Sequence, residues 1–397
     1  MALPADLISK IRSAVNRQRL LDTAVALVEV PSPTRSAGAV ADRLSEILRQ
    51  DGFAAERPVA DWPEAPAVAV RLNADAPGRV LQFDGHLDTV HLPFVPPRVE
   101  DGVLCGSGAS DMKGGIAACV EALRALRETS ALTAGGILLT AHDHHEGPWG
   151  DRRQLRALID AGYVGHAVLL PEYLADRLPI AGRGMAIFEV VIRREGEAAH
   201  EVLRPHTEPN VLDTGAELVV RLRDLRERLK ATSDLHAGCD AAFVGKIVSG
   251  EIYNQHPVEC RVHGTRRWIT PGTADAVRSD FYKLLDDLAR ASRTAITADF
   301  AVQGDAFRIE ASDPLVAAFQ AAHAAVVGHP LPLGGKPFVD DGNTFASLAG
   351  IPALTHGPDA KGAHTLEERV PVDELVRLAQ VYALTAVSYC AYPEGRP

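Results

Sequence analysis

The chain has 397 residues, of which 46% are hydrophobic and 23% are charged, so it is long enough for two or three globular domains. Its 41 Lys and Arg against 52 Asp and Glu give a net charge of −11, which disfavours binding to nucleic acid or to an anionic membrane. Five scattered cysteines without a C-x-x-C spacing exclude a disulfide scaffold and a thiolate zinc site. Since no apolar run resembles a signal peptide or a membrane span, we expect a cytoplasmic protein.

The first half of the chain alternates short apolar runs with amphipathic stretches. Strands are predicted at 67–72, 80–83, 137–141 and 167–170, and helices at 114–126 and 151–161. This pattern is typical of an α/β domain with a mixed or parallel sheet, in which ligands bind beyond the carboxyl ends of the strands. His86, Glu146 and Glu172 each follow one of these strands, so we expect them at one rim of the sheet.

A different pattern begins near residue 184. Alternating apolar residues predict strands at 185–193 and 297–300, and apolar repeats every three or four residues predict helices at 218–229 and 277–288. After residue 312 the α/β pattern returns, with a strand at 350–354 and a helix from Asp373 onward. We therefore predict a discontinuous catalytic domain of residues 1–183 and 310–397, and an inserted α+β domain of residues 184–309.

Two short motifs after the predicted strands carry candidate metal ligands. His86 and Asp88 lie two residues apart, and a metal-bound imidazole usually needs a carboxylate on its second ring nitrogen, so we expect Asp88 to be that partner. Asp111 lies in the glycine-rich segment 106–115, where the backbone can turn sharply and begin a helix. Taken alone, each motif is a weak signal, and the second is equally typical of a plain loop before a capped helix.

Three further segments complete a set of candidate ligands. The segment 138–150 contains Glu146 after a cluster of histidines, Glu172 follows the strand at 167–170, and His364 lies in the glycine-containing segment 355–368. Two histidines and three carboxylates on loops after strands are a ligand set expected for two divalent ions.

The order and spacing of these five motifs resemble the zinc amidohydrolase family that includes acetylornithine deacetylase, succinyl-diaminopimelate desuccinylase, aminoacylase and glutamate carboxypeptidases. The resemblance extends from Val28 to the helix after His364. It implies a catalytic domain with a mixed, mostly parallel sheet flanked by helices, and an inserted lid and dimerisation domain that forms a homodimer. It also implies one or two divalent ions, with zinc as the first choice and manganese or cobalt as alternatives.

The resemblance assigns roles to the candidate ligands. Asp88 is similar to the acid that orients the first histidine ligand, and Asp111 to the carboxylate that bridges two ions. The ligands implied for the first ion are His86, Asp111 and Glu172, and those implied for the second are Asp111, Glu146 and His364.

The inserted domain contains residues that resemble the family's substrate-binding groups. His200 is similar to a histidine that supports the oxyanion, often from a partner subunit. Asn254 and Arg267 resemble the asparagine and arginine that hold the substrate carboxylate, and a planar guanidinium suits this role. Thr265 replaces an Asp found in many relatives, which leaves Arg266 as the alternative arginine.

Two further features bear on the substrate pocket. Gly342 and Asn343 lie in a segment that resembles the glycine-rich loop lining the pocket in relatives, where backbone N–H groups can contact a carboxylate or an oxyanion. Trp149 follows the histidine cluster and is interpreted either as a wall of the pocket or as a core residue.

One position departs from the family pattern. Relatives have a second glutamate, the general base, immediately before the residue that matches Glu146, and this chain has His145 there. Imidazole has a pKa near 6.5 and can transfer protons, so His145 is the first candidate for the base. Asp143 is the second candidate, if the turn bulges. Two other hypotheses are that His144 or His145 joins the metal ligands, and that activity is lost.

The sequence thus leads to one main hypothesis and two alternatives. The main hypothesis is a metal-dependent hydrolase of a linear amide bond, which deacylates or cleaves an N-acyl amino acid or a related small carboxylated amide through a metal-activated bridging water. The first alternative is a hydrolytic deaminase of an amino-substituted aromatic acid with the same metal site. The second is a non-catalytic, metal-dependent binder.

Overall fold

The computed structural model describes residues 3–204 and 207–393. The chain forms two compact units. The first unit contains Met1–Ile180, Ile309–Gly334 and Asp340–Pro397, and the second contains Ala181–Arg308 and Gly335–Val339. The short return of the chain to the second unit at Gly335–Val339 has no counterpart in the sequence analysis, because no local pattern marks it.

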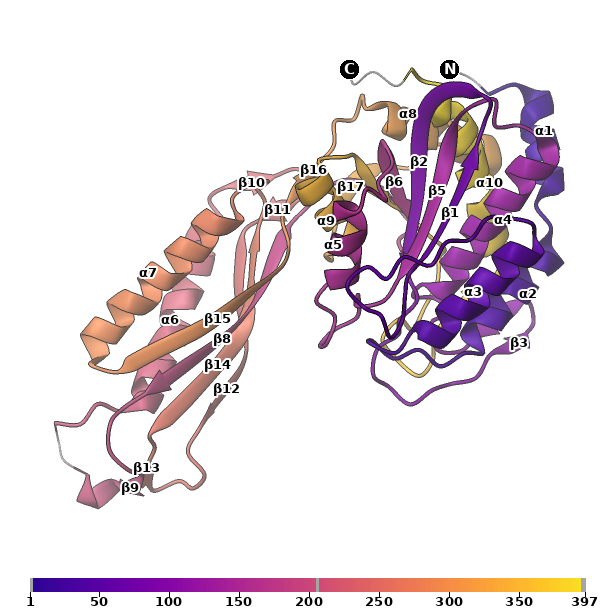
Figure 1. The fold of residues 1–397 in the computed structure, drawn as a ribbon. Coiled ribbons are helices and arrows are strands. Elements are labelled where there is room, and N and C mark those ends of the chain that lie inside the picture. Colours follow the sequence, from indigo (N-terminus) through magenta and orange to yellow (C-terminus); the bar gives the residue numbers. More distant parts are fainter. Residues whose placement is uncertain (1–2, 205–206, 394–397) are drawn as a thin grey trace. The chain divides into compact units, whose positions relative to one another are not determined.

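A five-stranded sheet lies at the centre of the first unit (Figure 1). Its order is β1-β5-β2-β6-β18, formed by Val68–Asn73, Ala134–His142, Ala76–His86, Ala167–Leu170 and Ala353–Thr355. Only β1 pairs antiparallel to its neighbour, and β5, β2, β6 and β18 run parallel. The predicted mixed, mostly parallel sheet flanked by helices is confirmed.

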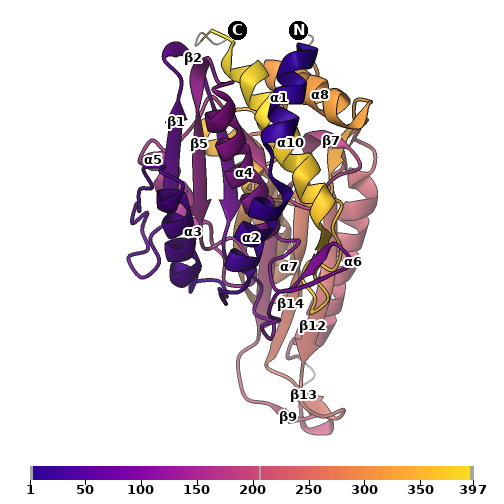
Figure 2. The same cartoon turned by 90° about the vertical axis from the view of Figure 1, so that its right-hand side faces the viewer.

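Helices cover both faces of this sheet, which explains why its inner strands are apolar on both sides. In β6, Ala167 and Leu169 belong to one apolar core, whereas Val168 and Leu170 belong to another, because successive strand residues point to opposite faces. Figure 2 shows α2, α4 and α10 over the first face. The helices of this face are α1 (Ala5–Ala14), α2 (Arg17–Val28), α3 (Gly38–Gln50), α4 (Lys113–Thr129), α8 (Pro314–Val327) and α10 (Val372–Cys390).

Shorter elements cover the second face. These are α5 (Arg153–Asp160), the four-residue helix α9 (Asp341–Thr344) and the π-helical turn Phe345–Ala349. A small three-stranded sheet of the first unit consists of β3 (Arg98–Glu100), β4 (Val103–Cys105) and β19 (Arg369–Pro371). The strands β7 (Leu178–Gly182), β16 (Phe307–Arg308) and β17 (Leu333–Lys336) form another three-stranded sheet at the positions where the chain passes from one unit to the other.

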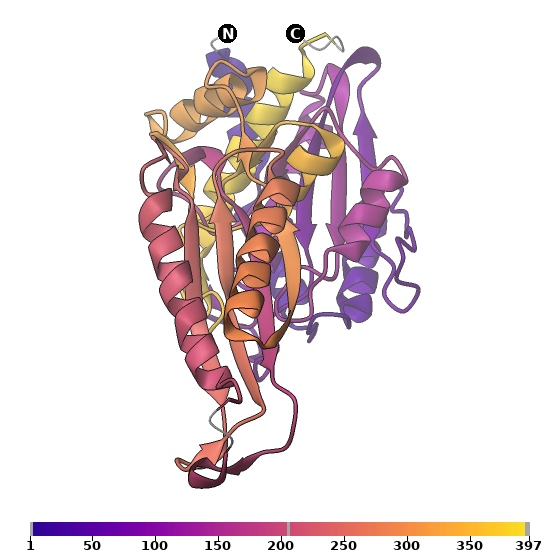
Figure 3. The same ribbon diagram turned by 90° about the vertical axis from the view of Figure 1, so that its left-hand side faces the viewer.

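The second unit is an antiparallel sheet with two helices on one face (Figure 3). The strand order is β12-β14-β8-β15, formed by Ala241–Ser249, Glu259–Trp268, Gly184–Arg193 and Ala295–Gly304, and the helices are α6 (Val211–Leu229) and α7 (Ala274–Ser292). Alternate residues of β8, such as Phe188 and Val190, are buried with Leu218 and Leu222 of α6. Small pairs lie outside this sheet: β9 (Ala199–His200) with β13 (Gln255–His256), and β10 (Ser233–Asp234) with β11 (Gly238–Cys239).

The predicted elements differ from the observed ones mainly in their ends. The strand predicted at 80–83 is longer, and His86 is its last residue rather than part of a following loop. The strand predicted at 350–354 is Ala353–Thr355, because Gly350 has a positive φ of 64° that ends the preceding helical turn. None of the described helices combines the length and apolar character needed to cross a lipid bilayer.

His356 makes the stability of the first unit sensitive to acid. It directly follows β18, is fully buried, and contacts the ring of Phe319 at a centroid distance of 4.9 Å. Burial, and then the nearby Arg377 guanidinium, hold the pKa of His356 well below its usual value. The folded state therefore leaves this imidazole neutral at a pH at which the unfolded chain, with a pKa near 6.5, binds a proton.

We expect the free energy of unfolding to fall as the pH drops below 6.5, and His356→Leu to remove part of that fall. One differential proton corresponds to about 1.4 kcal/mol per pH unit, so the variant and the wild type should diverge by roughly 2 kcal/mol between pH 6.5 and pH 5. Urea unfolding of the chelator-treated proteins measures both curves. Parallel curves would show that His356 is not the acid-sensitive group.

Candidate metal and catalytic site

Three parallel strands bring the candidate ligands to one edge of the central sheet. His86 is the last residue of β2 and pairs in register with His142, the last residue of β5. Glu146 follows β5 after a turn, and Glu172 follows β6. The carboxyl ends of parallel strands share an edge, and the structure places His86, Glu146 and Glu172 together there.

Two glycines allow the backbone around Glu172 to pack closely. A Cβ at Gly115 of α4 would lie 2.5 Å from the backbone oxygen of Pro171, and a Cβ at Gly357 would lie 2.0 Å from that of Glu172. Any larger residue at either position would displace the segment that carries Glu172. These two glycines, both distant from Glu172 in the sequence, thus allow the close packing that fixes the position of its carboxylate.

The His86 imidazole has one nitrogen fixed and one directed at carboxylates. Its Nδ1 donates to the backbone oxygen of Asp88 at 2.9 Å, so the acceptor nitrogen is Nε2. Nε2 lies 3.2 Å from Oδ1 of Asp111 and 4.0 Å from Oε1 of Glu172. A metal ion held by these three residues would meet a correctly oriented lone pair.

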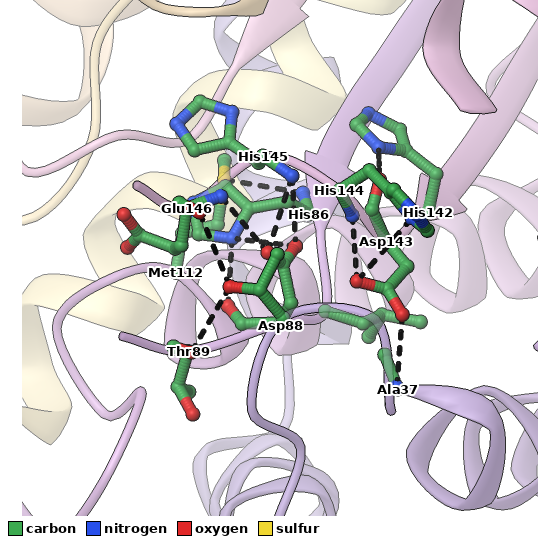
Figure 4. A network of polar contacts seen from close by, with 12 residues as sticks. Ala37, His86, Asp88, Thr89, Met112, His142, Asp143, His144, His145 and Glu146 are labelled. Carbon is green, nitrogen blue, oxygen red and sulfur yellow. Dashed lines mark hydrogen bonds and ion pairs between the residues drawn. The ribbon is translucent and has the colours of Figure 1, made fainter. Parts of the chain in front are cut away.

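The carboxylate of Asp88 has a different role from the expected one. Its Oδ1 is 3.7 Å from Nδ1 of His86, which is too long for a hydrogen bond. Instead, the carboxylate accepts the backbone N–H groups of His145, at 3.1 Å, and Glu146, at 2.9 Å (Figure 4). Asp88 therefore orients His86 through its backbone and holds the turn that presents His145 and Glu146.

Asp111 lies between the two groups of ligands. Its Oδ1 faces His86, and its Oδ2 lies 3.2 Å from Nε2 of His364. The same nitrogen of His364 lies 3.1 Å from the Glu146 carboxylate. One carboxylate with an oxygen toward each group is the arrangement of a bridging ligand between two ions.

The charges of this cluster fit divalent cations. Burial, and then Asp111, raise the pKa of Glu172 well above its usual value. Hydrogen bonds to Asp111 and Glu146 raise the pKa of His364 to about 10, so in the metal-free protein this imidazole carries a proton. The raised pKa of Glu172 shows a buried carboxyl group without enough nearby positive charge. In addition, one potential ligand atom of each of His86, Asp111 and Glu146 lies within 4.8 Å of the others. We conclude that these residues fit a metal centre.

His145 faces this cluster. Its ring stacks on His86 with a centroid distance of 4.0 Å and an interplanar angle of 11°. Its Nδ1 lies 2.7 Å from Oδ2 of Asp341, and its Nε2 lies 3.8 Å from Oε1 of Glu172. The imidazole therefore lies against two of the proposed metal ligands, His86 and Glu172.

Asp143 does not face the cluster, which corrects its proposed role as a base. Its carboxylate accepts three backbone N–H groups, those of Arg35 at 2.8 Å, His144 at 2.6 Å and Ala37 at 3.0 Å. Figure 4 shows Asp143 turned toward Ala37. Through its bonds to Arg35 and Ala37, Asp143 instead fixes the segment before α3.

The structure also corrects the expectation for Gly342 and Asn343, which lie within α9 and not in a loop. The Gly342 N–H donates to Oδ1 of Asp340 at 2.9 Å, and Oδ1 of Asn343 accepts the Asp340 N–H at 3.3 Å. Both residues are buried in this capping box. Their polar groups stabilise the helix, so they do not supply the expected free donors to a substrate.

Three of the remaining predicted residues belong to the second unit. His200 and Asn254 belong to the second unit and are adjacent, with 3.0 Å between Nε2 and Nδ2. Arg267 lies on β14 of the same unit and is half-buried. Their contact with a substrate stays a prediction. Trp149 is 42% exposed and touches His91, so its interpretation as a core residue is wrong.

Two residues of the site were missed by the sequence analysis. Asp341 binds His145, as described above, and Glu368 binds the loop that carries Asp111. One oxygen of Glu368 accepts the Gly108 N–H at 3.0 Å, the Ser110 N–H at 3.3 Å and the Ser110 hydroxyl at 3.1 Å. Glu368 lies four residues after His364, and this proximity was the only sequence signal for it.

Comparison with known proteins decides the family. The model of peptidase family M20/M25/M40 matches residues 83–388. The chain belongs to this family. It is a metal-dependent hydrolase of amide bonds, and the main hypothesis from the sequence is confirmed at this level.

Similar M20 proteins match almost the whole chain. A succinyl-diaminopimelate desuccinylase of Alkalilimnicola ehrlichii is 29% identical over 380 residues, covering 91% of this chain and 96% of the relative. The structure of aminopeptidase PepT from Bacillus cereus has a TM-score of 0.80 at 19% identity, covering 95% of this chain and 99% of PepT. A Bacillus subtilis protein described as a dinuclear metal-binding peptidase of the M20 family has a TM-score of 0.68 at 15% identity, covering 94% and 97%.

Proposed function

We propose that this M20 hydrolase removes the acyl group from, or cleaves, an N-acyl amino acid or a related small carboxylated amide. The observation that carries the proposal is the position of Asp111, which has one oxygen toward His86 and the other toward His364 and thus links the two groups of proposed ligands. The similarity to a desuccinylase over 91% of the chain supports an acylated amino acid as substrate.

The proposal assigns metal binding to five residues and proton transfer to His145. His86, Asp111 and Glu172 would hold one ion, and Asp111, Glu146 and His364 the other. When bound, such ions polarise a scissile carbonyl and acidify water. His145 accepts a proton from the attacking water at Nε2 and returns it to the leaving amine.

The second unit supplies the proposed substrate-binding groups. Burial, and then the neighbouring Arg183, lower the pKa of Arg267. Nη1 of Arg267 is buried and has no hydrogen-bond partner in the described part of the chain. A half-buried guanidinium beside a second one favours an anion, so we assign the substrate carboxylate to Arg267, with Asn254 beside it. His200, which contacts Asn254, is assigned to the oxyanion.

Three finer assignments belong to the same proposal. Zinc is the first choice of metal, because histidine and carboxylate ligands suit it, with manganese and cobalt as alternatives. A homodimer through the second unit would follow the pattern of relatives. A cytoplasmic location is consistent with the absence of any disulfide among the five cysteines, all of which the structure describes.

Product analysis tests the proposed reaction. Protein reconstituted with zinc is incubated with N-acetyl, N-succinyl, N-carbamoyl and N-aroyl amino acids and with amino-substituted aromatic acids, and the products are identified by mass spectrometry. We expect an acid and an amine from at least one N-acyl amino acid. Ammonia from the aromatic acids alone would replace the proposal with hydrolytic deamination, and binding without any product would replace it with a non-catalytic role.

A further inference from the structure

A chain of buried polar side chains lies behind His145. It consists of Asp341, the first residue of α9, then His142 at the end of β5, and Asp84 within β2. Nδ1 of His145 lies 2.7 Å from Oδ2 of Asp341, the same oxygen lies 3.4 Å from Nε2 of His142, and that nitrogen lies 3.4 Å from Oδ2 of Asp84. The exposed fraction of each of these four side chains is 10% or less.

Two cations on its other sides keep Asp341 ionised. Nε of Arg152 lies 3.3 Å from Oδ1 of Asp341, and both side chains are buried. His142 donates from Nδ1 to the backbone oxygen of Asp143 at 3.0 Å, and its Nε2 faces two carboxylates. Both nitrogens of His142 therefore face acceptors, which is the environment of an imidazolium.

An ionised carboxylate accepts hydrogen bonds only, and this fixes the form of His145. Because Nδ1 of His145 lies 2.7 Å from Asp341, Nδ1 must carry the hydrogen. The acceptor lone pair of the neutral ring is then on Nε2, the nitrogen that lies 3.8 Å from Glu172. The stacking of the ring on His86 restricts its rotation further.

We propose that Asp341 is the positioning residue for His145, which holds the imidazole in one tautomer and one orientation with Nε2 toward the metal ligands. The inference rests on the proposed role of His145 in proton transfer, and it concerns a residue that the sequence analysis did not assign.

The first test reads the tautomer directly and needs no substrate. Long-range ¹⁵N–¹H correlation spectra of the full chain, labelled in histidine, are recorded before and after zinc loading, and His145→Gln identifies the signals of His145. We expect hydrogen on Nδ1 and none on Nε2 in wild type, and a mixture of tautomers in Asp341→Asn. Hydrogen on Nε2 in wild type would overturn the proposal, even if no Asp341 variant folds.

The second test separates positioning from general structural support. Asp341→Asn should lower kcat by about 10²- to 10⁴-fold with little change in KM or metal content, and Asp341→Glu should recover part of the loss. Wild-type kcat in Asp341→Asn would overturn the proposal, and so would a loss of kcat with an unchanged tautomer. Loss of a bound ion would also overturn it, because Asp84, His142 and Asp341 lie close enough to hold one themselves.

Asp143→Asn is the matched control. Asp143 is a buried carboxylate two residues before His145, but it accepts only backbone N–H groups. The variant should lower Tm and leave the His145 tautomer unchanged. The two proposals can fail separately. If the wild-type protein hydrolyses no amide but the His145 tautomer changes in Asp341→Asn, then the proposed reaction is wrong and the positioning role of Asp341 still holds.

Discussion

Replacing Asp111 with alanine is expected to lower kcat by at least about 10³-fold, even at saturating zinc. One carboxylate oxygen of Asp111 faces His86 and the other faces His364, so its loss removes a ligand from each proposed ion. A metal ion contributes several kcal/mol to stabilising transition-state charge, and each 1.36 kcal/mol corresponds to a factor of ten in rate. Steady-state kinetics with metal analysis by mass spectrometry measures both losses.

Glu121→Gln is the control for this variant. Glu121 is a fully buried carboxylate on α4 that binds Arg19 rather than the metal ligands. The control should lose stability and keep its metal content. An Asp111→Ala protein that keeps full metal content and more than a tenth of wild-type kcat would contradict the bridging role.

The second large effect is expected from His145→Gln. Its side chain keeps polarity and approximate length but cannot transfer a proton, so kcat should fall by about 10²- to 10⁴-fold. KM and the number of bound ions should stay near the wild-type values, because the five proposed ligands are unchanged. Kinetics and metal analysis on the same preparation test this result.

His144→Gln provides the neighbouring comparison. The His144 ring is buried at an edge-on contact with Trp62, with a centroid distance of 4.4 Å and an angle of 72° between the rings, and it makes no contact with the metal ligands in the described structure. This variant should lower Tm more than kcat. A loss of one ion per chain in His145→Gln would show instead that His145 is a metal ligand.

Local sequence patterns predicted the part of the site that depends on strand ends. His86, Glu146 and Glu172 follow apolar runs, and parallel pairing brings such positions to one edge whatever the rest of the chain does. The strand ends themselves were less accurate, since β2 extends through His86. Hydrogen bonding to neighbouring strands extends β2 beyond its apolar residues, and the hydrophobicity pattern of the sequence does not indicate where this pairing ends.

The partners of these residues depend on tertiary contacts and were not predictable in the same way. Asp341 meets His145 although 196 positions separate them, and nothing near either residue indicates the other. The orientations of Asp88 and Asp143 were also unpredicted, because each carboxylate accepts backbone N–H groups of a turn whose shape sequence does not specify. The segment with Gly342 and Asn343 resembles a substrate-binding loop in sequence, and for this reason its capped helix was not predicted.

The central claim is that water attacks the carbonyl carbon of an amide, and isotope labelling tests it most directly. The zinc-reconstituted protein is incubated in H₂¹⁸O with the best N-acyl amino acid of the panel, and the products are analysed by mass spectrometry at early times. The account predicts one ¹⁸O atom in the carboxylate of the released acid and none in the amino acid. A primary amide released together with a hydroxy acid that carries the ¹⁸O atom at the carbon that bore nitrogen would contradict it, because water would then have attacked that carbon and not the carbonyl.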